Sequence, residues 1–345
     1  MKRRAYLLII LFPSIMYSQV GAFYSLSASR FARATGLGNV FTGIAEGAEA
    51  AYYNNAGLAF ENSYSIAYSN YPFHSGCILS KTTYPSFNFA LSVPIDSAGN
   101  NLSMYITNAN KLSDLPRNPL VVNLSYSRKI INNLALGIGI NYYYSSLESD
   151  DYIGNPSKFI FDFSFAALYK NDKLFSNFLN DQLKLGLKFN NLLSSNYSYI
   201  DENQISPLAQ ELRTGLSYSI EPKLLYKEYH YLKILFAFDA VWHLVNYKSD
   251  YLAPNWGFEM TLLEILSLRY GQESWREIFC VYPFFHKNII NRMGIGFNLP
   301  IKMLFKTENN INLLFDIVFS DWKNIDQKGL EKSFFTIQLA YDLIK

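Results

Sequence analysis

The stretch Leu134-Ala-Leu-Gly-Ile-Gly-Ile-Asn-Tyr-Tyr-Tyr144 alternates strictly between two kinds of side chain. Successive side chains of a β-strand point to opposite faces, so this period of two predicts a strand with one apolar face and one small or polar face. The apolar face carries Leu134, Leu136, Ile138, Ile140 and Tyr142. The opposite face carries Ala135, Gly137, Gly139, Asn141 and Tyr143.

The same alternation recurs from Ser63 to Lys345, in segments separated by clusters of Asn, Asp, Ser, Gly and Pro. Clear examples are 183–190, 292–299 and 334–343. We place about fourteen strands, an even number of the sort that bacterial membrane barrels use. The expected strands are 63–73, 75–83, 86–94, 121–131, 134–148, 159–170, 181–192, 211–220, 231–244, 253–265, 266–274, 292–301, 311–320 and 334–344, and 102–108 is a possible extra one.

The number of strands separates two architectures that share this alternation. A soluble β-sandwich also alternates, but its charged side chains would need surface exposure. A barrel of about fourteen strands is too wide to fill with its own side chains, so its polar inner face meets water or a plug. Charges expected in that lumen are Lys184, Lys188, Arg213, Asp316 and Asp342. The sequence therefore predicts an all-β fold, a transmembrane antiparallel β-barrel whose apolar face contacts outer-membrane lipid.

Turn residues support this arrangement. Asn132-Asn133 joins two alternating runs, and asparagine tolerates the positive φ of tight hairpin turns. Such short connections are expected on the periplasmic side. Longer polar stretches at 148–157, 194–211 and 275–291 are expected to be extracellular loops.

Composition and charge argue against a helical membrane protein and against a nucleic-acid-binding protein. The 345 residues are 50% hydrophobic but 17% charged, against roughly 25% charged in an average soluble domain. No run after Tyr17 approaches the roughly 18 apolar residues of a membrane-spanning helix. The net charge is +2 and no basic cluster follows Lys2-Arg3-Arg4, so no nucleic-acid partner is expected.

The first residues look like an export signal. Lys2-Arg3-Arg4 precedes the apolar run 5–12, Pro13 and the small Ser18, which is the order of a signal peptide. We therefore expect three parts: a signal peptide at 1–18, a plug segment at 19–62 and the barrel at 63–345.

Between Ala28 and Glu61 the alternation stops, and alanine and glycine dominate. Alanine at this density favours a short helix, and Gly36 and Gly38 allow a tight turn or a close backbone approach. Gly36, Gly38 and Gly43 faintly resemble a dinucleotide-binding loop, but the spacing is wrong and no strand precedes them. We expect a short helical plug and no cofactor.

This segment resembles a known family. The run from Ser29 ends in Tyr52-Tyr53-Asn54-Asn55-Ala56-Gly57-Leu58-Ala59-Phe60. It resembles the N-terminal signature of the PorV/PorQ-type outer-membrane proteins, distant relatives of the FadL transporters of hydrophobic compounds. Their element reads Tyr-x-Asn-Pro-Ala-Gly-Leu, so Asn55 stands where the family has proline. Shorter matches follow in family order at 186–192, 212–218, 257–259 and 268–271.

The resemblance implies a fourteen-stranded FadL-like barrel with its N-terminal segment folded into or under the lumen. The residues that carry the plug signature are Gly36, Gly38, Tyr53, Asn54, Asn55, Gly57 and Leu58. It also implies a first function, an accessory role in type IX protein secretion in which the extracellular loops bind secreted proteins or a surface partner.

The relationship to FadL gives an alternative function, the passage of hydrophobic small molecules. Phe31, Leu37, Phe41, Tyr52 and Tyr53 would then line an apolar pocket near the plug. The simpler interpretation of the same residues is that they pack the plug against the wall.

No enzyme is expected. The histidines His74, His230, His243 and His286 show no HExxH or other metal-binding spacing, and no G-x-S-x-G motif occurs. Lumenal carboxylates such as Asp239 and Asp316 are expected to pair with lysine or arginine. Cys77 and Cys280 lie far apart in sequence, which leaves open whether they form a disulfide.

Overall fold

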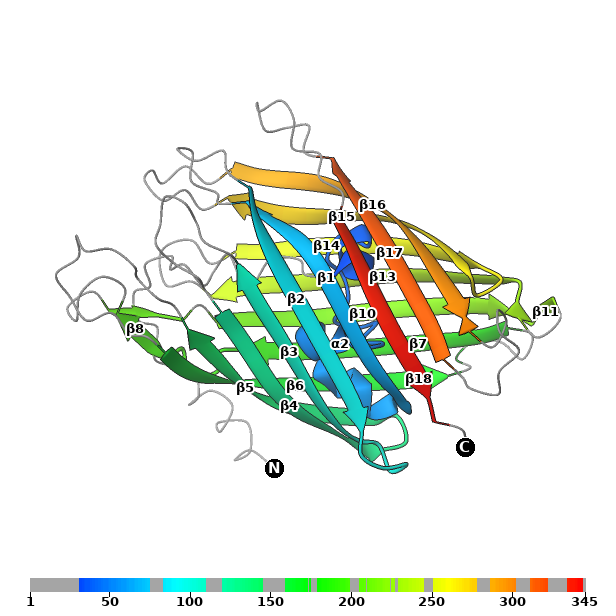
Figure 1. The fold of residues 1–345 in the computed structure, drawn as a ribbon, viewed down its shortest axis with the longest axis horizontal. Helices are drawn as coiled ribbons and strands as arrows, with labels where there is room; N and C mark the ends of the chain where they lie inside the picture. The colour runs from blue at the N-terminus through cyan, green and yellow to red at the C-terminus, as the bar shows by residue number, and fades with distance from the viewer. Residues whose placement is uncertain are drawn as a thin grey trace, which may run out of the picture.

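The chain forms one closed antiparallel β-barrel (Figure 1). The computed structural model describes residues 31–74, 83–109, 120–144, 159–172, 174, 179–198, 205–208, 210–223, 225–226, 229–244, 251–277, 286–301, 311–321 and 334–343. Within these residues fourteen strands make up the wall, and β1 closes it by pairing with β2 on one side and β18 on the other. The predicted fold class is confirmed.

The wall strands are joined to their sequence neighbours around the barrel. They are β1 (Ser63–His74), β2 (Thr83–Pro94), β3 (Asn100–Ala109), β4 (Leu120–Ile131), β5 (Leu134–Tyr144), β6 (Phe159–Asp172), β7 (Leu179–Asn190), β10 (Gln210–Pro222), β13 (Leu232–Leu244), β14 (Tyr251–Leu262), β15 (Leu266–Glu277), β16 (His286–Pro300), β17 (Ile311–Asp321) and β18 (Phe334–Asp342). Two small hairpins lie outside the wall, β8 (Asn196–Ser198) with β9 (Ile205–Pro207), and β11 (Leu225–Tyr226) with β12 (Tyr229–His230).

The alternation predicted for 134–144 is present in β5. Ala135, Gly137, Gly139, Asn141 and Tyr143 are buried inside the barrel, whereas the residues between them are half-buried or exposed on its outside. The strands β7, β16 and β18 show the predicted faces in the same way. Large apolar side chains that lie exposed on the outer face include Leu124, Ile138, Phe161, Phe236 and Met293. A closed wall with an apolar outside and a polar inside is the transmembrane barrel of the outer-membrane type.

Several predicted boundaries were wrong. The optional strand 102–108 is a full wall strand, β3, whereas 75–82 lies outside the described residues and Thr83 already begins β2. Residues 191–192 and 263–265 are in turns, and 275–277 and 286–291, expected in a loop, belong to β15 and β16. Main-chain pairing such as Trp275 with Asn288 continues beyond the alternating segment, because ladder hydrogen bonds do not depend on side-chain polarity.

The two rims of the barrel differ. The described connections β2–β3, β4–β5 and β14–β15 are short and share one rim, where β11 also lies (Figure 1). The longest connections, β5–β6, β7–β10 and β17–β18, share the other rim, where β8 lies. Short turns face the periplasm in outer-membrane barrels, so we call the first the periplasmic rim and the second the extracellular rim. The expected loop 194–211 is on the extracellular rim and contains β8 and β9, whereas 148–157 lies outside the described residues.

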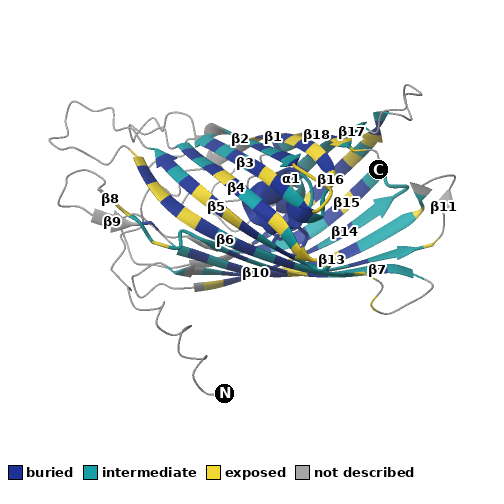
Figure 2. Cartoon of the chain, turned by 90° about the horizontal axis from the view of Figure 1, so that it is seen from below, coloured by how far each residue is buried: buried dark blue, intermediate teal, exposed yellow. Residues whose placement is uncertain are grey.

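The segment before β1 folds inside the barrel (Figure 2). It contains the helices α1 (Ala32–Gly36) and α2 (Ala50–Tyr53) and the 3-10 helix η2 (Asn55–Phe60), as the alanine content predicted. We call residues 31–60 the plug. Its α1 packs against β15 to β18, and its η2 packs against β2 to β6.

No helix in the described part of the chain is long and apolar enough to cross a membrane. The predicted signal peptide, Cys77 and Cys280 lie outside the described residues, as do the side chains of His74, His243 and His286.

Candidate functional site: the plug and the lumen

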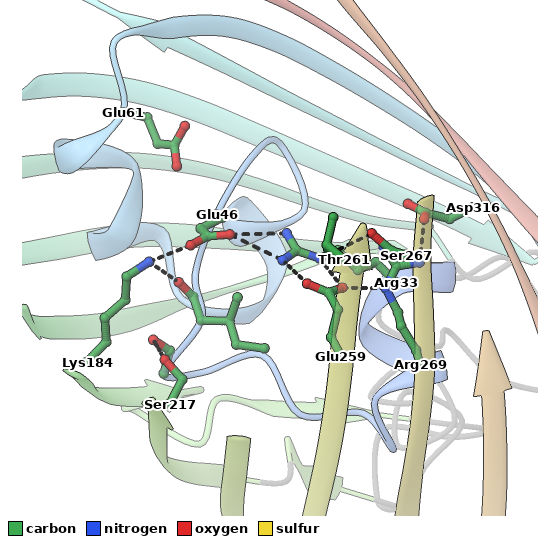
Figure 3. Close-up of polar contacts among 12 residues, drawn as sticks. Arg33, Glu46, Glu61, Lys184, Ser217, Glu259, Thr261, Ser267, Arg269 and Asp316 are labelled. Atoms are coloured by element: carbon green, nitrogen blue, oxygen red, sulfur yellow. Dashed lines mark hydrogen bonds and ion pairs between the residues drawn. The ribbon is translucent and has the colours of Figure 1, made fainter. Parts of the chain in front are cut away.

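Six charged side chains form a continuous chain of ion pairs across the lumen (Figure 3). In order of contact they are Lys184, Glu46, Arg33, Glu259, Arg269 and Asp316. Lys184 lies 2.7 Å from Glu46, and Arg33 lies 3.2 Å from Glu46 and 2.9 Å from Glu259. Because positive and negative groups alternate, each charge faces an opposite one, and we call this chain the lumenal ion-pair chain.

The plug provides the middle of the lumenal ion-pair chain and the wall provides both ends. Arg33 lies on α1 and Glu46 follows in the plug, whereas β7 carries Lys184, and β17 carries Asp316. Burial alone would raise the pKa of Glu46, but Lys184, Lys233 and Arg33 together hold it well below its ordinary value. Glu46 is therefore ionised, and its charge ties the plug to β7.

Glu49 lies three residues after Glu46 in the plug and has a different environment. Its side chain is buried, with 2% of the residue exposed, and its Oε2 has no hydrogen-bond partner among the described residues. Burial, reinforced by the nearby Asp316, raises the pKa of Glu49 to about 8. The plug thus holds a neutral carboxylic acid near neutral pH, close to the lumenal ion-pair chain.

Asp239 on β13 holds the backbone of the plug instead of a cation. Its Oδ2 accepts hydrogen bonds from the backbone N–H groups of Phe41 (3.1 Å) and Thr42 (3.0 Å) and from the Thr42 hydroxyl (2.7 Å). We expected Asp239 to pair with lysine or arginine, as Asp316 does with Arg269. Instead, three donors of the adjacent plug residues Phe41 and Thr42 converge on this one oxygen.

The other charges predicted in the lumen also face inward. Lys188 donates to the backbone carbonyl of Tyr52, and Arg213 pairs with Glu211 of the same strand at 2.7 Å. Asp342, half-buried at the periplasmic end, accepts a hydrogen bond from Asn312 at 3.1 Å.

The residues of the predicted plug signature attach the second half of the plug to the wall. The Asn54 amide donates to the carbonyls of Thr42 (2.8 Å) and Ala167 (3.1 Å), and the Asn55 amide donates to Ile138 (3.3 Å). Asn54 also caps η2 by accepting from the Ala56 N–H group. Gly57 and Leu58 are buried within η2. The signature therefore has a structural role in this chain.

Glycines mark the places where the plug backbone touches the wall. A Cβ added at Gly186 would overlap the carbonyl group of Thr42, and one at Gly271 would overlap the backbone of Leu37. In the plug, Gly38 has φ +72° and lies against the backbone of Gln272, so both its conformation and its position require glycine. Small residues on the inner face of the strands therefore make room for the plug.

The predicted pocket residues lie together in the hydrophobic core of the plug. Phe31, Leu37, Phe41 and Tyr52 belong to one buried cluster with Tyr53, and each is at most 8% exposed. Aromatic rings continue this cluster to the wall: Phe41 is 5.3 Å from Tyr53, and Tyr52 is 5.1 Å from Tyr105 on β3. We call Phe31, Leu37, Phe41, Tyr52 and Tyr53, together with Tyr105 of the wall, the aromatic cluster.

The sequence did not single out Arg33, Glu46, Glu259 or Arg269 as functional. Glu259 and Arg269 occupy inner positions of neighbouring strands, paired directly across the ladder. An opposite-charge pair at paired inner positions is a signal that could have identified them.

The fold and the lumen define a plugged transmembrane β-barrel. Two solved structures with a similar fold are a FadL homologue from Pseudomonas aeruginosa and the toluene transporter TodX from Pseudomonas putida. Both are 11% identical to this chain over 91% of it, with TM-scores of 0.46, and the alignments cover 98% and 97% of those chains. The sequence matches no protein-family model and no curated protein. Likeness at this level does not extend to function.

Proposed function

We propose that this protein lies in the bacterial outer membrane and carries small apolar molecules across it. The observation that carries this proposal is the aromatic cluster, which lies buried inside the same lumen that holds the lumenal ion-pair chain. The plug reaches the wall from β2 to β6 and from β15 to β18, and Thr42 and Gly43 contact β7, β10 and β13 between them. The plug therefore obstructs a straight water-filled path.

A plugged lumen of this kind discriminates by polarity. An ion or sugar would lose its hydration on meeting Phe41, Tyr52 and Tyr53, which is costly. An apolar solute gains free energy at the same place, at roughly 25 cal/mol per Å² of apolar surface removed from water. The barrel is thus suited to hydrocarbon or fatty-acid cargo and unsuited to general diffusion.

The test compares uptake and conductance in liposomes that contain the purified barrel. We expect uptake of toluene or oleate above the level of empty liposomes, together with no steady ion conductance in planar bilayers. The saturable binding of toluene or oleate to the barrel is measured as well, and Phe41→Leu in the aromatic cluster should weaken it several-fold. Phe161→Leu, the same change on the exposed outer face, is the matched control and should not. Uptake equal to that of empty liposomes would contradict the proposal.

A second candidate is a PorV/PorQ-type accessory of protein secretion, and one observation favours it. The extracellular connection after β7 is ordered by Asp162, a buried residue of β6. Its carboxylate accepts from the backbone N–H groups of Leu193 (3.0 Å) and Ser195 (2.8 Å), directly before the β8–β9 hairpin. A preorganised loop loses less entropy on binding a protein than a mobile loop does.

This second candidate has its own test. A purified C-terminal signal domain of a type IX substrate should bind the barrel, and Asp162→Ala should weaken that binding while toluene uptake stays unchanged. Asp96→Ala is the matched control, because Asp96 organises the β2–β3 turn on the opposite rim through the N–H groups of Ala98 and Asn100. Absence of binding by the unaltered barrel would reject the accessory role.

A further inference from the structure

Three side chains that the lumen does not use meet on the periplasmic rim. Glu221 lies near the end of β10, His230 on β12, and Glu264 in the turn between β14 and β15. Each offers one ligand atom, and these three atoms all lie within 4.8 Å of one another. Glu221 and His230 belong to the end of β10 and to the connection that follows it, and Glu264 belongs to the neighbouring turn, so the barrel fold brings the three together.

His230 and Glu221 lie close together without forming a hydrogen bond. The imidazole Nδ1 is 3.4 Å from Glu221 Oε1, and this nitrogen is buried with no hydrogen-bond partner among the described residues. A tetrahedral zinc site with bonds near 2.0–2.1 Å separates its ligand atoms by about 3.4 Å. The Nδ1–Oε1 distance is therefore that of two ligands on one metal ion.

The third ligand is already oriented. Glu264 Oε1 accepts a hydrogen bond from the His230 backbone N–H group at 3.0 Å, and the Glu264 carbonyl accepts from Asn298 at 3.1 Å. A carboxylate has two oxygens, so this bond fixes the side chain and leaves one oxygen for a metal. Two carboxylates with a neutral imidazole carry a charge of −2, which one divalent ion balances.

We propose that Glu221, His230 and Glu264 bind a divalent transition-metal ion of the zinc class. An imidazole nitrogen with two carboxylates suits zinc, whereas calcium and magnesium prefer oxygen ligands alone. Three protein ligands leave the fourth position of a tetrahedron for water. The ion would fasten the β10–β13 connection to the β14–β15 turn, independently of what passes through the lumen.

The test uses the full barrel, stripped with a chelator and titrated with Zn²⁺ by calorimetry, with Co²⁺ absorption as a second readout. We expect one Zn²⁺ per barrel, a tetrahedral Co²⁺ spectrum and a higher melting temperature on loading. His230→Ala should abolish all three. Glu264→Gln keeps an acceptor for the His230 N–H group and should weaken binding by roughly tenfold or more.

Asp96→Asn removes one carboxylate from the same rim and is the matched control, so it should leave the zinc affinity unchanged. Two results would overturn the proposal. One is the absence of stoichiometric binding by the unaltered barrel, and the other is binding that persists undiminished in both His230→Ala and Glu264→Gln. Heat-modified migration in electrophoresis establishes that each variant is folded.

Discussion

Glu46 and Glu49 lie three residues apart in the plug. Glu46 is ionised between two cations, whereas Glu49 is buried and its Oε2 has no hydrogen-bond partner in the part of the chain that the structure describes. The difference extends to the two halves of the plug. Residues 31–46, the charged arm, are held by ion pairs to β7 and β14 and by Asp239. Residues 47–60, the signature arm, are held by amide groups and by close packing of small residues.

Each arm therefore depends on a different kind of interaction. Buried ion pairs are strongly destabilised when one partner is removed, because the other charge is left without compensation. Packing of small residues fails when volume is added. Substitutions that remove charge should act on the charged arm, and substitutions that add volume should act on the signature arm.

Gly57→Val should have the largest effect, because it acts where the two arms touch. An added Cβ at Gly57 would overlap the carbonyl oxygen and the Cβ of Ala45. We expect a loss of about 3 kcal/mol or more in unfolding free energy. Displacement of the plug should also give ion conductance in planar bilayers. Gly294→Ala is a milder comparison and should cost less, since its added Cβ would lie 3.3 Å from the Gly36 Cα, a tight contact that a small shift relieves. A plug that stays closed in Gly57→Val would contradict the packing of the arms.

Arg33→Met should have the next largest effect and is confined to the charged arm. It leaves Glu259 and Glu46 without the guanidinium that joins them. The Arg33 side chain is 16% exposed and that of Glu46 is 28% exposed. We therefore expect a loss of about 2 kcal/mol in unfolding free energy, less than for a fully buried pair. Urea unfolding in detergent measures it. Arg33→Lys keeps the charge but cannot reach both carboxylates through one planar fork, so its cost should be intermediate.

The two arms were not equally predictable from the sequence. Alternation in strands such as β5 fixes which residues face inward, so the barrel and the inward Lys184, Lys188 and Asp316 could be predicted. The signature arm could be singled out as a non-alternating segment because its residues are contiguous. The ion-pair chain and the Glu221–His230–Glu264 group were not predicted, since their members lie on strands or turns far apart in sequence and meet through barrel register.

Boundary errors have the same physical origin. The optional strand 102–108 proved to be β3, and β15 and β16 continue into residues assigned to a loop. Side-chain alternation reports where a strand meets lipid, whereas backbone pairing decides where the strand ends.

Glu49→Gln should give a smaller effect of opposite sign. The folded pKa of about 8 exceeds the ordinary 4.5, so the folded barrel holds a proton that the unfolded chain has released between these values. Stability is thus lost as pH rises from about 4.5 to 8. Glutamine does not titrate, so Glu49→Gln removes this loss. We expect a gain of about 1 kcal/mol in unfolding free energy at pH 8 and none at pH 4.5. The gain is small because the buried amide retains part of the burial cost.

Urea midpoints at pH 4.5 and 8 measure the effect of Glu49→Gln. Glu46→Gln provides the contrast: the folded pKa of Glu46 is depressed, so its ionised form stabilises the barrel at neutral pH and this stability is lost as pH falls. Equal gains for Glu49→Gln at both pH values would argue against a neutral buried acid.

Asn55→Pro should have the smallest effect, although proline is usually disruptive. Asn55 is the first residue of η2, where a missing N–H group is tolerated. The preceding Asn54 has φ −163° and ψ 92°, the extended conformation that a following proline requires. The loss of a 3.3 Å hydrogen bond to Ile138 is then offset by a less flexible unfolded chain. We expect the unfolding free energies of Asn55→Pro and the unaltered barrel to be equal within about 1 kcal/mol.

Ala56→Pro is the control. The residue before this proline would be Asn55, which already lies within η2, so this substitution should destabilise the barrel more. Equal destabilisation by both prolines would show that packing around the arm, and not its backbone conformation, decides which residue stands at position 55.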